Sequence, residues 1–397
     1  MRLAARAGRI TPSPTLSMAA MAKAMAAQGI DVVDFALGEP DFDTPEPVKA
    51  AAEAAMRAGF TKYTAPSGIE ELKHAIANKF ETDQGLRYDT SQILVSCGAK
   101  HTLYNLAEAL FEAGDEVLLL SPFWVSYQDQ VLLNDAKPVI IQTREDDGYA
   151  ITRSLLESHV TPRTKAIIVN SPCNPTGATY DRAMLEAIAE VALCNDLVII
   201  SDEIYEKILY DGAQHISIAS LGPEVASRTL VVNGVSKAYA MTGWRIGYAA
   251  GPKELITAMA NIQSQSTSNP SSISQKAAVA ALQSDGTFTQ QMVAEFDCRR
   301  RLMVERLNAI PGIRCRMPSG AFYAFPNVTG VLGRRHGTGA ITSPTELANF
   351  FLQEARVVVV PGEPFGSCSH IRLSYATSLE AVRRGLDRME AALKSLR

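Results

Sequence analysis

The sequence has few cysteines, and their spacing suggests neither a metal site nor a disulfide framework. Its 397 residues include six cysteines, which form no CxxC pair and no cluster with histidine. Isolated cysteines of this kind are typical of reduced thiols in a cytosolic protein. We therefore expect a cytoplasmic protein without a structural metal.

Long apolar runs and a strong excess of charge are missing as well. Every apolar stretch is interrupted by Gly, Pro or a charged residue before it reaches the length of a membrane helix. The net charge of −4 is too small to draw the chain to nucleic acid or to an anionic membrane. We expect neither kind of partner.

No G-x-G-x-x-G motif opens the first βα unit, which disfavours a nicotinamide-dependent dehydrogenase.

Acidic residues are absent before Asp31, whereas Arg2, Arg6 and Arg9 recur at helical spacing. An Arg-rich, acid-free start can be a transit peptide. However, the Thr-Pro-Ser-Pro segment at 11–14 ends the pattern early, and no apolar segment follows it. We favour an N-terminal arm that lies on the protein.

The middle of the chain alternates between short apolar runs and helix-like segments. The β-like runs are 93–96, 116–120, 166–169, 197–201, 229–232 and 246–250, and helices are expected at 99–112, 181–194 and 253–263. Continuous apolar strands that alternate with helices indicate a parallel sheet buried on both faces. The sequence therefore predicts an α/β fold.

The two ends of the chain follow a different, α+β pattern. We expect helices at 16–28, 289–308 and 378–395, and short strands near 313–317, 321–325 and 356–360. We predict three parts: an N-terminal arm with part of a small domain (1–48), a large domain (49–285) and the rest of the small domain (286–397).

Polar residues follow several of the predicted strands, where open α/β sheets bind ligands. The run 93–96 leads into Gly98, Ala99 and Lys100, where a helix begins and free backbone N–H groups could bind an anion. The run 166–169 leads into a Pro- and Gly-rich loop that contains Asn174. A tight turn at Gly98 and a plain Asn-Pro turn at Asn174 explain these segments as well as ligand binding does.

A carboxylate and a lysine end two further strands. Asp202 follows the run 197–201, and Tyr205 lies one turn on and can face the same pocket. Lys237 follows the run 229–232, and burial would lower its pKa and suit it to Schiff-base chemistry. The alternatives are that Asp202 is a helix N-cap and that Lys237 is a lysine of a surface loop. With Arg245, the strand ends offer the groups that a phosphate-bearing pyridine aldehyde uses.

These residues belong to longer motifs that resemble the class I, fold-type I aminotransferases dependent on pyridoxal 5′-phosphate (PLP). The motifs are Gly38-Glu39-Pro40-Asp41-Phe42, Asn174-Pro175-Thr176-Gly177, Ser201-Asp202-Glu203-Ile204-Tyr205, Ser236-Lys237 with Arg245, and Arg372-Leu373-Ser374-Tyr375-Ala376. The resemblance covers nearly the whole chain and is closest to bacterial aspartate aminotransferases of subgroup 1b. It implies a large domain with a mostly parallel seven-stranded sheet, and a smaller α+β domain built from both chain ends.

The resemblance also implies roles in cofactor binding. Lys237 would hold PLP and move the substrate proton. Asp202 would pair with the pyridine nitrogen, while Asn174 and Tyr205 would bind the ring oxygen. Trp124 would stack on the ring; a core aromatic is the alternative. The phosphate would be bound by backbone or side chains of Gly98, Ala99, Lys100, Ser236, Arg245 and, from a second subunit of a homodimer, Tyr63.

For the substrate, the resemblance implies that Arg372 binds the α-carboxylate, beside Gly38, Asn174 and Trp124. Many relatives bind the distal carboxylate with an arginine, but the matching position here is Ser264. Subgroup 1b instead uses a lysine and two hydroxyls, which match Lys100, Ser13 and Thr15.

Two departures from the family pattern matter. An arm lysine common in that subgroup is Thr11 here, which weakens a prephenate assignment. A serine that often contacts the phosphate is Gly234.

The predicted reaction is L-aspartate plus 2-oxoglutarate to oxaloacetate plus L-glutamate, by a ping-pong mechanism. Transamination of prephenate, aromatic amino acids or alanine stays open, as does a PLP lyase or synthase. A non-catalytic regulator is disfavoured, because no room is left before residue 12 for a DNA-binding module.

Overall fold

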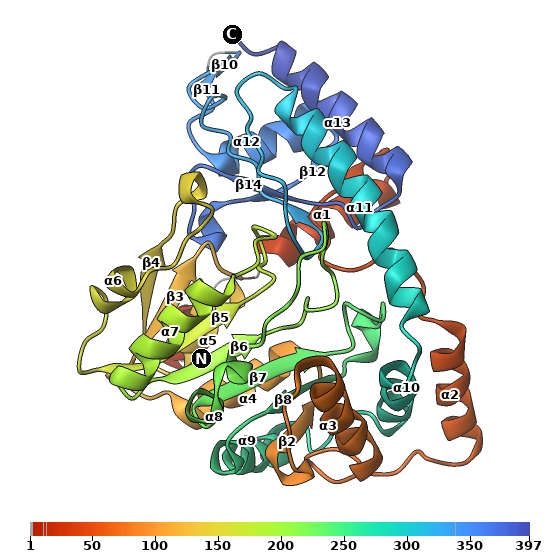
Figure 1. The fold of residues 1–397 in the computed structure, drawn as a ribbon. Coiled ribbons are helices and arrows are strands. Elements are labelled where there is room, and N and C mark those ends of the chain that lie inside the picture. The colour runs from red at the N-terminus through yellow and green to blue at the C-terminus, as the bar shows by residue number, and fades with distance from the viewer. Residues whose placement is uncertain (1–2, 11, 13, 338) are drawn as a thin grey trace.

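A seven-stranded sheet forms the centre of the protein (Figure 1). The computed structural model describes residues 3–10, 12, 14–337 and 339–397. Across the sheet the strands are β2 (Ile93–Ser96), β8 (Gly247–Ala250), β7 (Thr229–Gly234), β6 (Val198–Asp202), β5 (Thr164–Asn170), β3 (Glu116–Ser121) and β4 (Lys137–Gln142). Strand β8 pairs antiparallel with β2 and β7, and the other neighbouring pairs of this sheet are parallel, which confirms the predicted mostly parallel sheet.

Helices cover both faces of this sheet, because successive strand residues point to opposite sides. Alternate strand residues pack on one face against α4 (Ala99–Leu110), α5 (Ser126–Leu133) and α9 (Lys253–Ser266). The opposite face packs against α2 (Glu46–Arg57), α3 (Glu70–Gln84), α7 (Arg182–Cys194), α8 (Pro223–Ala226) and α10 (Ser272–Leu282). The short helix α6 (Arg153–Glu157) contacts α7. The strands are therefore buried on both sides, as their continuous apolar runs predict.

Both ends of the chain contribute to a second, smaller layer. Strand β1 (Val33–Asp34) pairs with β12 (Val357–Val358), and β14 (Ile371–Ser374) lies between β13 (Val360–Pro361) and β9 (Tyr323–Ala324). A hairpin joins β10 (Arg335–His336) to β11 (Gly339–Ala340). The helices are α1 (Pro14–Ala27), α11 (Thr287–Asn308), α12 (Pro344–Phe350) and α13 (Leu379–Lys394). We propose domain limits near residues 48 and 285, since α2 packs on α10 in the large core and α11 begins at 287.

One predicted strand was wrong, and one strand of the central sheet was missed. The predicted strand at 313–317 is reduced to one bridge, between Arg314 and Asn327. Ile313 and Cys315 are buried in the small-domain core, so their alternation reflects one-sided packing without a strand partner. Conversely, β4 was not predicted; it is an edge strand with exposed Lys137 and Gln142 and carries a proline.

No helix in the described part of the chain has the length and apolar character needed to cross a membrane.

Candidate active site

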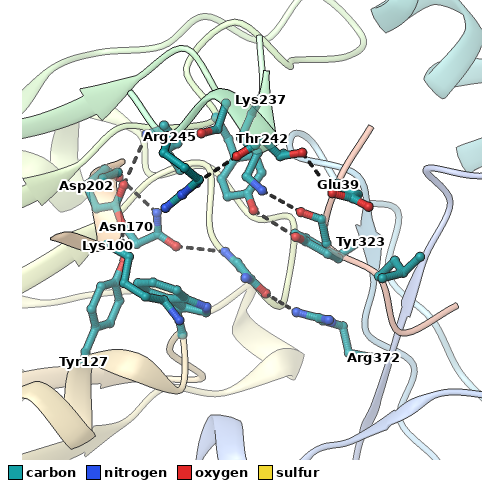
Figure 2. A pocket seen from close by; sticks show the side chains of 18 of the residues that line it. Glu39, Lys100, Tyr127, Asn170, Asp202, Lys237, Thr242, Arg245, Tyr323 and Arg372 are labelled. Carbon is teal, nitrogen blue, oxygen red and sulfur yellow. Dashed lines mark hydrogen bonds between the residues drawn. The ribbon is translucent and has the colours of Figure 1, made fainter. Parts of the chain in front are cut away.

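A cavity of about 510 Å³ lies beside the carboxyl ends of β5, β6 and β7 (Figure 2). The small domain closes it on the other side with segments around Gly38, Tyr323 and Arg372. The predicted site residues that line it are Gly38, Ala99, Lys100, Trp124, Asn174, Asp202, Tyr205, Ser236, Lys237, Arg245 and Arg372. Residues up to about 330 positions apart in the chain thus meet in one place, as the strand-end argument predicts.

Asp202 is the last residue of β6 and is almost completely buried. Its Oδ2 atom accepts a hydrogen bond of 2.7 Å from the Tyr127 hydroxyl, and Oδ1 accepts one of 3.2 Å from the Ile204 amide. Burial raises the pKa of Asp202 to about 6, although the hydrogen bond from Tyr127 opposes this rise. The carboxylate is therefore mainly ionised at neutral pH and is well placed to pair with a cation.

Lys237 lies in the loop that follows β7, and its ammonium group points into the cavity (Figure 2). Its Nζ atom donates a 2.5 Å hydrogen bond to the carbonyl oxygen of Gly38 and lies 5.9 Å from the centre of the Tyr205 ring. Burial lowers the pKa of Lys237 to about 8. A substantial fraction of this amine is therefore neutral near physiological pH and can act as a nucleophile or a base.

Arg372 is a buried guanidinium with unused hydrogen-bonding capacity. Its Nη1 atom donates to Asn174 Oδ1 at 3.0 Å and its Nη2 atom to the carbonyl oxygen of Ala36 at 2.7 Å. Its Nε atom is buried without a hydrogen-bond partner. The group lies 4.5 Å from the centre of the Tyr323 ring. Within the described residues no carboxylate forms an ion pair with Arg372, and Asp34 acts on it only through its charge, so a ligand carboxylate would complete its coordination.

The amino end of α4 forms a second anion-binding surface. Gly98, its N-cap, has a φ of +91°, and a Cβ atom there would clash with the Arg245 guanidinium. Among the residues that the structure describes, Arg245 donates only to two carbonyl oxygens, those of Thr242 (2.9 Å) and Cys97 (3.2 Å). The first N–H groups of a helix have no partner inside the helix. This corner therefore combines free donors with an uncompensated positive charge, which suits a phosphate group.

Lys100 and Trp124 form the outer wall. The Nζ atom of Lys100 lies 4.8 Å from the centre of the Trp124 ring. Burial, and then the charge of Arg245, lower the pKa of Lys100. Trp124 also packs edge-on against Tyr127, at 5.3 Å between ring centres.

Some predicted residues are not in the cavity. Gly98 borders it through Arg245 but is not part of its lining. Tyr63 lies outside it with 92% of its surface exposed. Ser13 lies outside the described residues, and so does the side chain of Thr15, whose backbone lies in the first turn of α1.

Several lining residues were missed by sequence reasoning, and three of them connect predicted residues. Asn170 Nδ2 donates to the Asp202 carbonyl oxygen at 3.0 Å, and its Oδ1 accepts from the Asn174 amide at 2.9 Å. The Tyr323 hydroxyl lies 2.8 Å from that of Tyr205. Tyr127 is the third of these residues, because its hydroxyl donates to Asp202. The others are Ala20, Lys23, Leu37, Glu39, Ile204 and Thr242. Asn170, at the end of its apolar run, carried a local signal, and Glu39 and Ile204 lie inside the family motifs.

The glycine at 234 has a structural cause. A Cβ atom there would lie 2.9 Å from both Gly247 Cα and the Ile246 carbonyl oxygen, because β7 and β8 approach closely at this point. No serine fits at this position.

Comparisons with known proteins agree with this geometry. The profile of the family "Aminotransferase class I and II" matches residues 30–389. An "Aspartate aminotransferase" of Geobacillus stearothermophilus is 45% identical over 395 residues, 100% of both chains. An "Aspartate/prephenate aminotransferase" of Cereibacter sphaeroides is 48% identical over 96% of both chains. The crystal structure of an aspartate aminotransferase from Rhizobium meliloti superposes with a TM-score of 0.96, at 46% identity over 100% of both chains. The chain belongs to the class I and II aminotransferases.

Proposed function

We propose that this aminotransferase uses PLP and transfers the amino group of L-aspartate to 2-oxoglutarate. The observation that carries the proposal is the meeting of Lys237, Asp202 and Arg372 in one cavity. A reactive amine, a buried carboxylate and a guanidinium lacking a carboxylate partner are what an amino-acid substrate and a pyridine cofactor require together.

The residues present fit PLP. Glycine at position 98 lets the Arg245 guanidinium lie against the amino end of α4, because a Cβ atom there would clash with it, so a positive charge and free backbone N–H groups can bind the same phosphate. The backbone of Gly98, Ala99 and Lys100 would hold that phosphate, together with Ser236 and Arg245. Asp202 would pair with the ring nitrogen, Asn174 and Tyr205 would hydrogen-bond the ring oxygen, and Trp124 would cover the ring. Bound PLP supplies an electron sink for the charge left when an amino acid loses its Cα proton.

Lys237 is the base in this proposal. Its pKa of about 8 gives a neutral amine that can take a proton from the substrate Cα and return it elsewhere. The hydrogen bond from Nζ to the Gly38 carbonyl oxygen aims the amine across the cavity. A Cβ atom at Gly38 would lie 2.8 Å from the Tyr323 hydroxyl, so glycine lets Tyr323 lie close to this segment.

Arg372 would orient the substrate by its α-carboxylate, and Asn174 fixes the guanidinium for that purpose. Lys100 would bind the distal carboxylate of aspartate from the outer wall, with Ser13 and Thr15 of the arm. Because Lys100 lies on the outer wall, away from Lys237 and Asp202, it would affect substrate preference and leave proton transfer unchanged.

Prephenate transamination is the second candidate. Relatives named "Aspartate/prephenate aminotransferase" are 48% and 44% identical to this chain. Thr11, where that subgroup often carries a lysine, argues against it.

We further propose a homodimer in the cytoplasm. Tyr63 is 92% exposed, as expected for a side chain that reaches the phosphate of a second subunit. The six cysteines are all free thiols, which supports a reducing compartment.

A substrate panel on the purified protein tests the proposal. We expect a yellow protein whose visible absorption band bleaches with aspartate and is restored by 2-oxoglutarate, with weaker responses to alanine, phenylalanine and prephenate. A colourless protein that takes up no PLP would contradict the proposal as a whole. A stronger response to prephenate would contradict the substrate assignment alone.

A further inference from the structure

A buried group of charged side chains lies behind the strand end that carries Asp202. We call Lys79, Gln84, Glu203, Glu206 and His215 the Glu203 cluster. Glu203 is 1% exposed, and Lys79 and Glu206 are buried as well. None of the five lines the active-site cavity.

Glu203 is the centre of this cluster. Its Oε1 atom accepts hydrogen bonds from Ser201 Oγ (2.9 Å) and Ser217 Oγ (2.7 Å). Its Oε2 atom accepts from His215 Nε2 (2.9 Å) and Gln84 Nε2 (3.1 Å). Burial would raise the pKa of Glu203, but His215 and Ser217 outweigh it and the net pKa is lowered. Glu203 is therefore negatively charged at neutral pH, inside the protein.

Three side chains of the cluster are spaced like metal ligands, but the site is not open to a metal ion. One ligand atom each from Glu203, Glu206 and His215 lies within 4.8 Å of the others. However, the Lys79 ammonium pairs with Glu206, and Gln84 Nε2 donates to Glu206 Oε2 at 2.5 Å as well as to Glu203. The positive charge that a metal would bring is already supplied by side chains.

The cluster is joined to the active site through the backbone. Glu203 follows Asp202 directly, and its amide donates to the Val232 carbonyl oxygen at 2.9 Å. Tyr205 comes two residues later in the same turn. Helix α3 contributes Lys79 and Gln84, so this turn is tied on its outer side to a helix of the large domain.

Burying several charges costs more than packing apolar residues of similar size, so stability alone does not account for the cluster. We propose that Glu203 and His215 are positioning residues, which hold the turn of Asp202 and Tyr205 and keep Asp202 a strong partner for a protonated ring nitrogen. This inference rests on the proposed PLP function.

Electrostatics supports the link. Burial is the main cause that raises the pKa of Asp202, and the neighbouring charge of Glu203 adds to the rise. Glu206 is not among the main causes of the shift at Asp202. The two glutamates of one cluster should thus differ in their effect on the cofactor.

The test compares Glu203→Gln with Glu206→Gln in the full-length chain. Each change removes one buried carboxylate charge, and both should lower the melting temperature. For Glu203→Gln we expect PLP to bind about tenfold more weakly, which is one pKa unit of lost pairing, and the visible band of the bound cofactor to shift. For Glu206→Gln we expect PLP affinity within about twofold of the unchanged protein, with the same band.

Equal PLP affinities and bands in Glu203→Gln and the unchanged protein would overturn the inference, and so would equal losses in both variants. If Glu203→Gln does not fold, His215→Asn, at a position nearer the surface, serves instead. It should weaken PLP binding about threefold, by less than the loss of the carboxylate itself, and an unaltered affinity would overturn the inference. If the unchanged protein binds no PLP, the proposed function itself fails, which separates the two outcomes.

Discussion

The floor and the mouth of the cavity are built differently. On the floor, Asp202, Asn174 and Arg372 are each at most 5% exposed, and every one is held by hydrogen bonds to neighbouring elements. At the mouth, Lys23 and Glu39 are exposed, and Lys100 lies against the face of Trp124. The buried, hydrogen-bonded residues of the floor suit one kind of chemistry. The more exposed residues of the mouth can change the substrate preference of the enzyme with few substitutions.

The largest effect should come from the floor, at Lys237. Lys237→Ala removes both the covalent anchor and the base, so we expect kcat/KM to fall by about 10⁴-fold or more for every amino donor. Steady-state kinetics with aspartate and alanine measures this loss. Lys253→Ala, at the exposed start of α9, is the matched control and should keep full activity. Residual activity above about one hundredth of normal would remove Lys237 from the mechanism.

Arg372→Lys should have the next largest effect. Lysine keeps the charge but loses the planar fork, so we expect kcat/KM to fall on the order of 100-fold, about the worth of two charge-assisted hydrogen bonds. The loss should be the same for aspartate and alanine, because both carry an α-carboxylate. A loss confined to aspartate would instead place Arg372 at the distal carboxylate and reverse the assignment of floor and mouth.

The amine of Lys237 should also show its lowered pKa in the capture of PLP by the cofactor-free protein. Only the neutral amine reacts, so the capture rate should rise roughly tenfold per pH unit and level off above about pH 8, the pKa that burial gives Lys237. Stopped-flow absorbance follows the reaction. A rate that keeps rising towards pH 10 would mean that Lys237 titrates like an exposed lysine and that the floor is wetter than the structure indicates.

The smallest effect belongs to the mouth. Lys100→Ala should lower kcat/KM for aspartate by about tenfold, the worth of one hydrogen bond to a charged group, and leave alanine nearly unchanged. The ratio of the two values is the measurement. Equal kinetics with aspartate before and after the change would exclude Lys100 from the distal carboxylate.

The sequence predicts the large domain better than the small one, for a physical reason. Strands such as 229–232 are buried on both faces and appear as unbroken apolar runs. Strand β4 lies at the sheet edge, is partly exposed and carries Pro138, so its pattern is weak. At 313–317 the alternation is real, but it reflects burial against the small-domain core without a neighbouring strand.

The sequence by itself determined the features that depend on neighbouring residues of the chain. These are the strand-end residues, the glycine turn before α4 and the family motifs. Their chemistry follows from residue type and from position at the end of a buried run. Sequence alone also excluded long membrane segments and strong charge.

Only the tertiary structure decided how these groups meet. Tyr127 reaches Asp202 across 75 residues, Arg372 reaches Asn174 across 198, and Lys237 reaches the Gly38 carbonyl across 199. The charged cluster behind Asp202 joins α3 to the same turn. Hydrophobic periodicity reports which face of an element is buried, but it carries no information about which distant side chain lies opposite, so these pairings appear only when the chain is folded.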